Sequence, residues 1–241
     1  MYSMVDIHSH ILPMVDDGAR SWEIAIEMVD MARRDGVTHM VATPHANFEY
    51  QYNRESHSVL LADLQSKVGD GIQLILGCDF HFSYENLEDA LAHSHRYTIG
   101  ETRYLLIELS DHSIPPHIAN MIFSLTSKGL IPILTHPERN RILHAEPQRV
   151  REWVAMGVIV QVTADSFTGR WGRSVQKQAH WYAEHGLLHV LASDAHGTTH
   201  RTPVLSKCRK TIVESYGERY ANLLLETNPL AIIENRPLPG A

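Results

Sequence analysis

Short apolar runs alternate along the chain with longer segments in which apolar residues recur at helical spacing. In the first such unit, residues 4–8 predict a strand and residues 22–35 predict a helix. Ser21 is a suitable N-cap for that helix and Gly36 is a suitable stop. The same alternation continues to the end of the chain, so the pattern predicts repeated strand–helix units.

Six further units follow the first. Their predicted strands cover residues 37–43, 72–76, 104–109, 131–135, 158–162 and 190–193. The predicted helices cover residues 53–68, 84–93, 116–128, 146–156, 172–185, 203–216 and 218–226. Near-continuous apolar strands that alternate with helices indicate a parallel sheet covered by helices. Seven units without a linker-like segment predict a single barrel-like α/β domain over residues 1–241, with a doubly wound open sheet as the alternative.

Composition narrows the class of protein. The 241 residues are 44% hydrophobic and 20% charged, as in ordinary globular proteins. A formal net charge of −7 argues against a general binder of nucleic acid or membrane surfaces, which normally presents a basic face. No run of about 20 apolar residues is present, so no membrane insertion is expected. No targeting signal is visible, and the isolated Cys78 and Cys208 are expected to be reduced thiols in a cytoplasmic protein.

Acidic and histidine side chains recur where the predicted strands end. In parallel α/β folds, the chemistry gathers at the carboxyl ends of the strands. Six of the seven predicted strands deliver such side chains to this rim. They are His8, His10 and Asp17, then His45, Asp79, His81, Glu108, His136, Glu138, Asp194 and His196. One shared site is therefore predicted there.

The spacing of these residues favours a metal centre. Alternate residues of a strand point to one face, so His8 and His10 can bind one ion together, and so can Asp194 and His196. Imidazole and carboxylate ligands without thiolate suit Zn, Mn or Fe. One His-x-His pair is a weak signal, but agreement among six strand ends is a stronger one. The number of ligands exceeds what one tetrahedral ion needs, which favours a multinuclear centre.

The remaining histidines and tryptophans are interpreted as structural. Trp153, Trp171 and Trp181 are expected to pack on helix faces, and Cys78 is expected to point into the core. The histidines without a partner at ligand spacing are expected on the surface or in packing: His39, His57, His93, His95, His112, His117, His144, His180, His185, His189 and His200.

These motifs resemble those of the PHP (polymerase and histidinol phosphatase) superfamily of metal-dependent phosphoesterases. The nearest resemblance is to its branch of bacterial tyrosine-protein phosphatases of capsule and exopolysaccharide synthesis. The matching segments are Asp6–Pro13, Asp16–Ala19, Thr43–His45, Leu106–Glu108, His136–Arg139 and Ser193–His196. The similarity spans nearly the whole chain in the right order, and the opening motif is specific to that branch.

The resemblance implies a distorted (β/α)7 barrel with two or three divalent ions, most often manganese, with Fe or Zn as alternatives. By the family's pattern, the first ion is held by His8, His10, Asp79 and Asp194. Asp79 bridges to a second ion, held also by Glu108 and His136. The third ion is held by Asp17, His45 and His196. The family's two phosphate-binding arginines match Arg139 and Arg201.

One position departs from the family's pattern. The family usually has Gly-x-Glu on its third strand, whereas this chain has Gly77-Cys78-Asp79. Aspartate is one methylene shorter than glutamate, so a bridging geometry would tighten, shift or lose an ion. His81, on the same face as Asp79, is a candidate to compensate.

The resemblance further implies hydrolysis of phosphotyrosine on protein, with the phosphorylated tail of a bacterial tyrosine kinase as the partner. Divalent ions would lower the pKa of water from about 16 toward 7, and hydroxide would attack phosphorus while Arg139 and Arg201 bind the phosphate. A tyrosine leaving group has a pKa of about 10, so it departs with less help from a general acid than an alkoxide would need. A homo-oligomer formed through the outer helices is compatible with this function.

Other functions stay open at this stage. A histidinol phosphatase would use the same metal chemistry in a different pocket. An amidohydrolase-type enzyme also begins with His-x-His, but it usually has a bridging lysine where this chain has Glu108. A catalytically silent metal-binding module that docks a kinase or polymerase is a third alternative. A cysteine-dependent phosphatase is excluded, because neither cysteine is followed by arginine six positions later.

Overall fold

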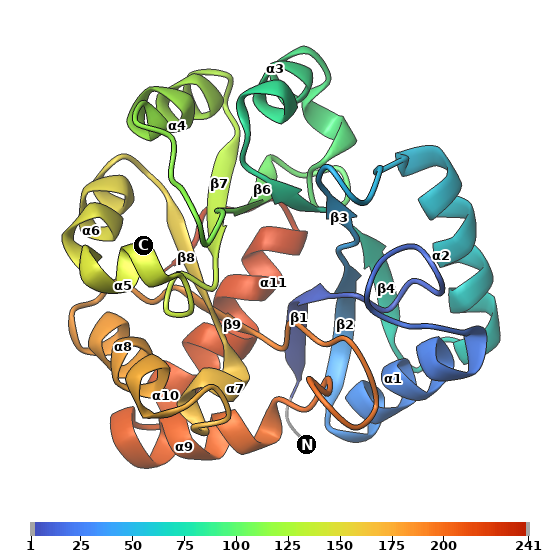
Figure 1. The fold of residues 1–241 in the computed structure, drawn as a ribbon. Helices are drawn as coiled ribbons and strands as arrows, with labels where there is room; N and C mark the ends of the chain where they lie inside the picture. The colour runs from blue at the N-terminus through green and yellow to red at the C-terminus, as the bar shows by residue number, and fades with distance from the viewer. Residues whose placement is uncertain (1–2, 240–241) are drawn as a thin grey trace.

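The computed structural model describes residues 3–239, in which every strand pairs in parallel with its neighbours. The strands surround a common centre, most helices lie outside them, and α11 lies across the centre in this view (Figure 1). The strands are β1 (Met4–Ser9), β2 (Val37–Ala42), β3 (His45–Ala46), β4 (Gln73–Leu76), β5 (Asp79–His81), β6 (Tyr104–Glu108), β7 (Ile131–Thr135), β8 (Ile159–Thr163) and β9 (Val190–Ala192). The predicted parallel α/β architecture is confirmed.

The helices follow the strands in the predicted order. They are α1 (Trp22–Arg34), α2 (Arg54–Val68), α3 (Tyr84–Ala92), α4 (Ile118–Ser127), α5 (Arg141–Ala145), α6 (Pro147–Ala155), α7 (Ala164–Phe167), α8 (Arg173–Glu184), α9 (Ser206–Tyr216), α10 (Glu218–Asn222) and α11 (Asn228–Ile233). A 3₁₀ turn, η1 (Ser94–Arg96), and a π-helical turn, η2 (Leu223–Thr227), complete the set. None of the helices in the described range is long and apolar enough to cross a membrane.

The local signals at α1 act as predicted. The Ser21 side chain accepts a hydrogen bond from the Ile24 backbone N–H, and Gly36 has a φ of 96°, which ends the helix in the left-handed region. The sequence pattern missed α5, α7 and α11, because four to six residues are too few to show helical periodicity.

The strands form two sheets rather than one closed sheet. One has the order β1-β2-β4 and the other has the order β3-β5-β6-β7-β8-β9. Two predicted strands are each broken, after Ala42 and after Leu76, and continue in the second sheet. A single parallel bridge joins Ser9 to Ala195. Residues 3–239 therefore do not form a barrel that is closed by a continuous ladder of hydrogen bonds between strands.

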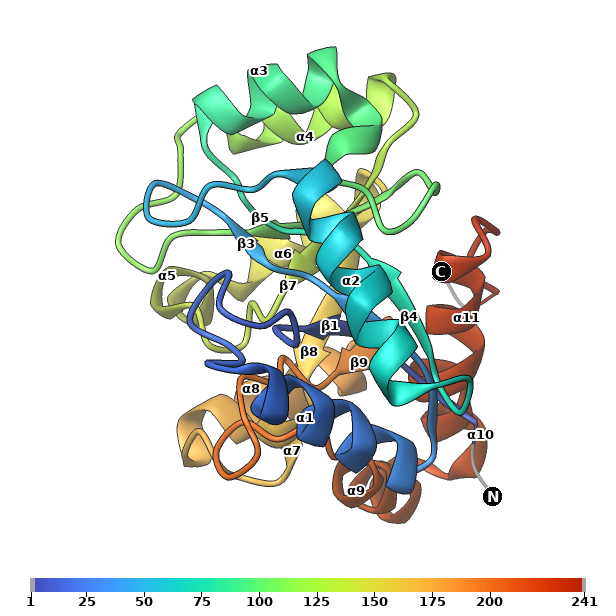
Figure 2. The same cartoon turned by 90° about the vertical axis from the view of Figure 1, so that its right-hand side faces the viewer.

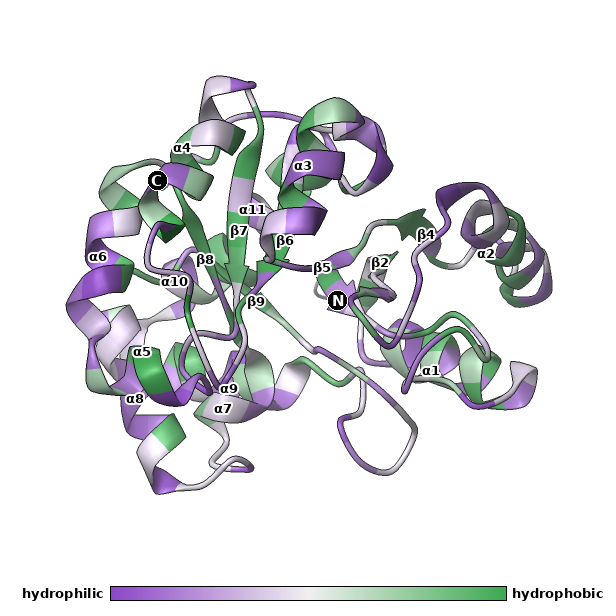
Figure 3. Cartoon of the chain, turned by 45° about the horizontal axis from the view of Figure 1, so that its top comes forward, coloured by the Kyte–Doolittle hydropathy of each residue, from purple (hydrophilic) through white to green (hydrophobic). Residues whose placement is uncertain are grey.

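The apolar core has an inner and an outer layer. The outer layer packs helix side chains such as Met28 and Ile212 against the strands. The inner layer fills the space between the strands, and α11 adds Ile232 to it beside Val5 and Tyr104. Hydropathy colouring shows mostly apolar strands inside and a mixture of polar and apolar residues along the surrounding helices (Figure 3). In Figure 2, α11 lies at the opposite end from the loops after β1 and β3, which border the candidate site.

Candidate metal centre

All nine predicted metal ligands meet at the carboxyl ends of the strands. They form four overlapping groups, and within each group one ligand atom from every member lies within 4.8 Å of the others. The groups are His10, Asp17, His45 and His196; His8, His10 and Asp194; His8, Asp79 and His136; and His45, Asp79 and Glu108. His81 belongs to none of these groups, although it lines the same cavity.

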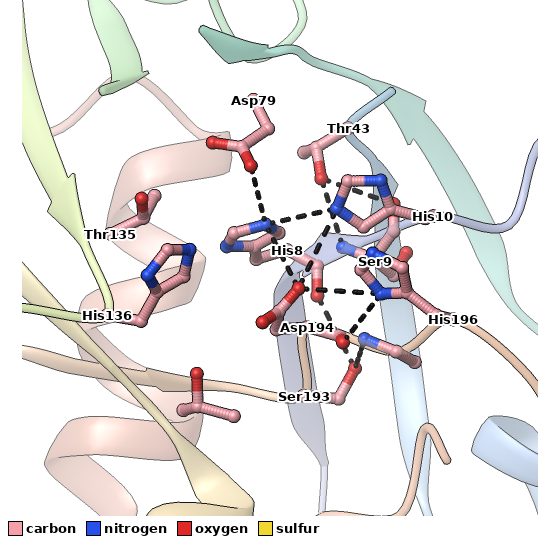
Figure 4. Close-up of polar contacts among 12 residues, drawn as sticks. His8, Ser9, His10, Thr43, Asp79, Thr135, His136, Ser193, Asp194 and His196 are labelled. Atoms are coloured by element: carbon pink, nitrogen blue, oxygen red, sulfur yellow. Dashed lines mark hydrogen bonds and ion pairs between the residues drawn. The ribbon is translucent and has the colours of Figure 1, made fainter. Parts of the chain in front are cut away.

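His8 lies in the middle of the cluster. Its Nε2 is 3.5 Å from Asp79 Oδ2 and 3.5 Å from Asp194 Oδ1, and it is 3.3 Å from His10 Nε2 (Figure 4). Two ligands of one tetrahedral ion, each bonded at about 2.1 Å, lie about 3.4 Å apart. The spacing of these side chains therefore suits ligands that share cations.

Several buried polar atoms of the cluster lack a hydrogen-bond partner within residues 3–239. They are both carboxylate oxygens of Asp79, Nδ1 of His45 and Nε2 of His196. Asp79 is only 1% exposed and accepts no hydrogen bond among residues 3–239; its nearest charged neighbours are His45 Nδ1 and His8 Nε2, at 3.3 and 3.5 Å from Oδ2. Burying a carboxylate that accepts no hydrogen bond is costly, and coordination of a cation removes that cost. The donor set thus fits divalent metal ions.

A second set of side chains orients the first. His8 Nδ1 donates to Gln161 Oε1 at 2.9 Å, and His10 Nδ1 donates to Asp16 Oδ2 at 2.7 Å. Each bond leaves Nε2 of the ring directed into the cluster, as in metal sites whose histidines donate their other N–H to an acceptor. Neither Asp16 nor Gln161 was predicted as a site residue. Asp16 lies in the segment Asp16–Ala19 that carries the family resemblance, whereas no sequence motif surrounds Gln161.

Gly18 makes the turn behind His10 feasible. A Cβ at this position would lie 2.2 Å from the His10 carbonyl oxygen, a distance that no side chain tolerates. The Gly18 N–H also donates to Asp16 Oδ1 at 3.0 Å. The glycine therefore lets the loop close tightly enough for Asp16 to reach the ring of His10.

The electrostatics of the cluster are dominated by burial and mutual charge. Burial opposes the protonation of His8 and His45, but the facing carboxylates outweigh it and raise the pKa to about 9 and about 11. Burial favours the neutral form of Asp79, yet His8 and His45 hold its pKa well below the usual range. Burial and the neighbouring His196 lower the pKa of His10 to about 4. Protons and divalent ions therefore compete for these ligands.

Backbone strain is concentrated at the site. Five non-glycine residues have positive φ in the described part of the chain, and three of them line the cavity. These three are His136 at 33°, Asp194 at 52° and Arg201 at 50°. Such conformations cost of order 1–3 kcal/mol each and persist where surrounding structure enforces them. The surrounding structure thus holds these three residues in unfavourable backbone conformations at the site.

Two arginines lie beside the cluster. Arg139 Nη2 is 2.5 Å from Asp194 Oδ2, and Arg201 Nη2 is 2.6 Å from Asp194 Oδ1. Nε of each arginine is buried and has no hydrogen-bond partner among residues 3–239. Both arginines line a cavity of about 640 Å³ together with seven of the nine predicted ligands, which are Asp17, His45, Asp79, Glu108, His136, Asp194 and His196.

 Seven of the nine ligands thus reach the cavity surface, while His8 and His10 lie beneath it.

Trp171 was predicted wrongly as helix-face packing. It lies in the turn between α7 and α8, lines the cavity, and has the guanidinium carbon of Arg139 4.7 Å from its ring centroid. His112, expected to be structural, also lines the cavity. Trp153 and Trp181 do pack within helices α6 and α8, as predicted. Only the tertiary structure brings Trp171 to the arginines, because its sequence neighbourhood carries no motif.

Several known proteins are similar to this chain over most of its length. The family model described as "Capsular polysaccharide synthesis, CpsB/CapC" matches residues 4–234. Tyrosine-protein phosphatase YwqE of Bacillus subtilis is 31% identical over 233 residues, which cover 95% of this chain and 91% of that protein. Tyrosine-protein phosphatase CpsB of Streptococcus pneumoniae is 30% identical over 239 residues, which cover 95% of this chain and 98% of that protein.

Solved structures extend the comparison. One is from work on YwqE of Bacillus subtilis and CpsB of Streptococcus pneumoniae, described as metal-dependent tyrosine phosphatases. It matches with a TM-score of 0.89 and 29% identity over 98% of this chain and 96% of that chain. The phosphotriesterase homology protein of Escherichia coli shares the fold alone, with a TM-score of 0.62 and 10% identity over 96% of this chain and 98% of that chain. This chain belongs to the CpsB/CapC family of capsular polysaccharide synthesis.

Proposed function

We propose that this protein is a metal-dependent phosphatase that hydrolyses phosphotyrosine on proteins. The observation that carries the proposal is the meeting of a histidine–carboxylate cluster and two arginines in one cavity. Ligands for cations and donors for a phosphate are what hydrolysis of a phosphate ester requires. The relatives named as tyrosine-protein phosphatases support the choice of phosphotyrosine.

The metal ligands are proposed to be the nine residues of the four groups: His8, His10, Asp17, His45, Asp79, Glu108, His136, Asp194 and His196. Divalent ions bound there would lower the pKa of water from about 16 toward 7 and so supply hydroxide at neutral pH. Asp79 belongs to two groups, which suits a bridging ligand despite its short side chain. We propose two or three ions, with manganese as the physiological metal.

Arg139 and Arg201 are proposed to bind the phosphoryl oxygens. Each guanidinium uses one Nη on Asp194, and its buried Nε is without a partner in the described structure. Those N–H groups have no acceptor among residues 3–239, and both arginines line the cavity that would hold an anion. A planar guanidinium can bind two phosphate oxygens at once, which orients the ester and neutralises charge that develops on it.

The leaving group also fits an aryl phosphate. A tyrosine phenol has a pKa of about 10, so its oxygen leaves as the anion more readily than the alkoxide of serine does. Leu109 and Val175 provide apolar surface in the cavity lining, where an aromatic ring can be desolvated. The partner is proposed to be the phosphorylated tail of a bacterial tyrosine kinase.

The wider setting is part of the proposal. We propose that residues 1–241 act as a single domain whose two sheets together make a distorted (β/α)7 barrel. Cys78 and Cys208 are buried free thiols, which supports a reducing compartment, and we propose the cytoplasm.

Activity of the purified protein on three substrates tests the function. The substrates are a phosphotyrosine peptide, a phosphoserine peptide and histidinol phosphate, each with manganese and with chelator. We expect turnover of the phosphotyrosine peptide that chelator abolishes and manganese restores. Preference for histidinol phosphate would replace the substrate and keep the metal chemistry. Bound metal and intact folding without turnover of any substrate would contradict the proposal and favour a silent metal-binding module.

A further inference from the structure

We infer that Trp171 is a positioning residue that holds Arg139 and Arg201 together as one anion-binding fork. The inference rests on the proposed function, because it concerns the arginines that bind the phosphate there. Neither the sequence motifs nor the comparisons draw attention to this residue, which lies in a turn between two helices.

The indole lies against both guanidinium groups. The guanidinium carbon is 4.7 Å from the Trp171 ring centroid for Arg139 and 5.8 Å for Arg201. Both distances are within the roughly 6 Å over which an aromatic face attracts a cation. The two arginines come from loops 62 positions apart, and one ring therefore links them.

The turn that carries Trp171 is firmly held. The Gly172 N–H donates to the Gly169 carbonyl at 3.0 Å, and both glycines have positive φ, 82° at Gly169 and 90° at Gly172. Glycine adopts these angles without strain, so the turn can present the indole to the cavity. The Gln176 side chain of α8 donates to the Phe167 carbonyl at 2.8 Å and ties the two ends of this segment together.

The same segment is tied to the Arg139 loop. Glu138, the residue before Arg139, is fully buried and accepts from the Thr163 N–H at 3.1 Å and from the Ser166 hydroxyl at 2.7 Å. These residues begin the α7 segment that leads to Trp171. A buried carboxylate thus links the Arg139 loop to the segment that leads to the indole.

The arginines need an anchor other than Asp194. Both bind the oxygens of Asp194, which is also a proposed metal ligand. A carboxylate shared with cations attracts the guanidinium groups less than a free one does, because the cations neutralise its charge. The ring of Trp171 is uncharged and does not coordinate metal, so it can keep both arginines in place when Asp194 is shared.

Binding of inorganic phosphate to the metal-loaded protein tests this role. Titration calorimetry compares the unmodified protein with Trp171→Leu, Trp171→Phe and the control Trp22→Leu. Trp22 is also partly buried and has a cation, Lys67 Nζ, 5.2 Å from its ring centroid, but it does not line the cavity. We expect Kd for phosphate to rise about tenfold in Trp171→Leu, two- to threefold in Trp171→Phe, and not at all in Trp22→Leu.

Two further readouts separate positioning from other roles. Metal content is expected to be unchanged in both Trp171 variants, and kcat/KM for a phosphotyrosine peptide and for a small aryl phosphate is expected to fall by the same factor. Unchanged phosphate affinity in Trp171→Leu would overturn the inference. A loss seen with the peptide but not with phosphate would also overturn it, by showing that the indole contacts the substrate. If Trp171→Leu does not fold, the two- to threefold rise in Kd for phosphate that is expected of Trp171→Phe tests the inference instead.

The results that would contradict the proposed function differ from those that would contradict the role of Trp171. An unmodified protein that binds metal and phosphate but hydrolyses no phosphate ester would contradict the phosphatase assignment. The affinity series for phosphate would still test the fork, since that measurement does not depend on turnover.

Discussion

The two ends of the strands are filled in opposite ways. At the amino end, α11 inserts Ile232 among apolar side chains such as Val5 and Tyr104. At the carboxyl end, the buried residues are ionisable, several lack hydrogen-bond partners, and three lining residues have positive φ. Burial of apolar surface stabilises a fold, whereas crowded charges and strain cost free energy. The comparison indicates that the amino end contributes to stability, whereas the carboxyl end carries the chemistry at a cost in stability.

The largest expected effect is on activity, at the carboxyl end. His8→Ala removes a member of two ligand groups. Metal ions supply several kcal/mol of transition-state stabilisation, so activity on a phosphotyrosine peptide should fall at least about 10³-fold. Bound metal, measured by elemental analysis, should fall with it.

The matched control for His8 is His57, a buried histidine of α2 that belongs to none of the four groups. His57→Ala should keep its metal content and its activity. Equal loss of metal in the two variants would mean that burial of a histidine, and not its place in the cluster, explains the effect.

The next effect is on stability, at the amino end. Ile232→Ala leaves a cavity among the inner core residues, and the free energy of unfolding should fall by about 2–5 kcal/mol. Activity per folded molecule should not change, because α11 lies at the opposite end from the loops after β1 and β3, which border the site (Figure 2). Denaturant unfolding and metal content, measured on one preparation, check both statements.

Ile122→Ala, which truncates a buried side chain of α4 in the outer core layer, is the control for that change. It should cost a similar free energy and should also spare activity. A large loss of activity in fully folded Ile232→Ala would contradict the view that the amino end of the strands affects stability without affecting activity.

The smallest effect concerns the residues that orient the ligands. Gln161→Leu removes the acceptor of the His8 ring N–H at 2.9 Å while keeping the side-chain volume similar. Loss of such an orienting group costs about 10–100-fold in metal affinity. Metal titration of the metal-free protein should show that weakening.

Gln178→Leu serves as the control, because Gln178 is a buried glutamine in α8 that belongs to none of the four ligand groups and does not line the cavity. Its metal affinity should equal that of the unmodified protein. Equal affinity in Gln161→Leu as well would show that the ring of His8 is held by packing alone.

Much of the fold was predictable because helices and strands leave local periodic patterns. The seven strand–helix units and the Ser21 cap depend on residues close together in sequence. The breaks after Ala42 and Leu76, which pass the chain between two sheets, were missed because they depend on pairing with distant strands. Helix α11 was missed because its six residues show no periodicity and its role depends on the cavity that it fills.

Most candidate ligands followed from the sequence, because they stand at or just after the end of an apolar run and parallel strands end at one rim. Asp17 lies further along the loop after the first strand, and the family resemblance implied its role. Their grouping, the orphaned oxygens of Asp79 and the support from Gln161 were decided only by tertiary structure. The same holds for Trp171, whose contact with Arg139 and Arg201 joins three separate loops. Local sequence determines which element forms and which side chains stand at its end. Contacts between loops depend on how far each loop reaches across the rim, and that distance is set by the packing of the whole chain.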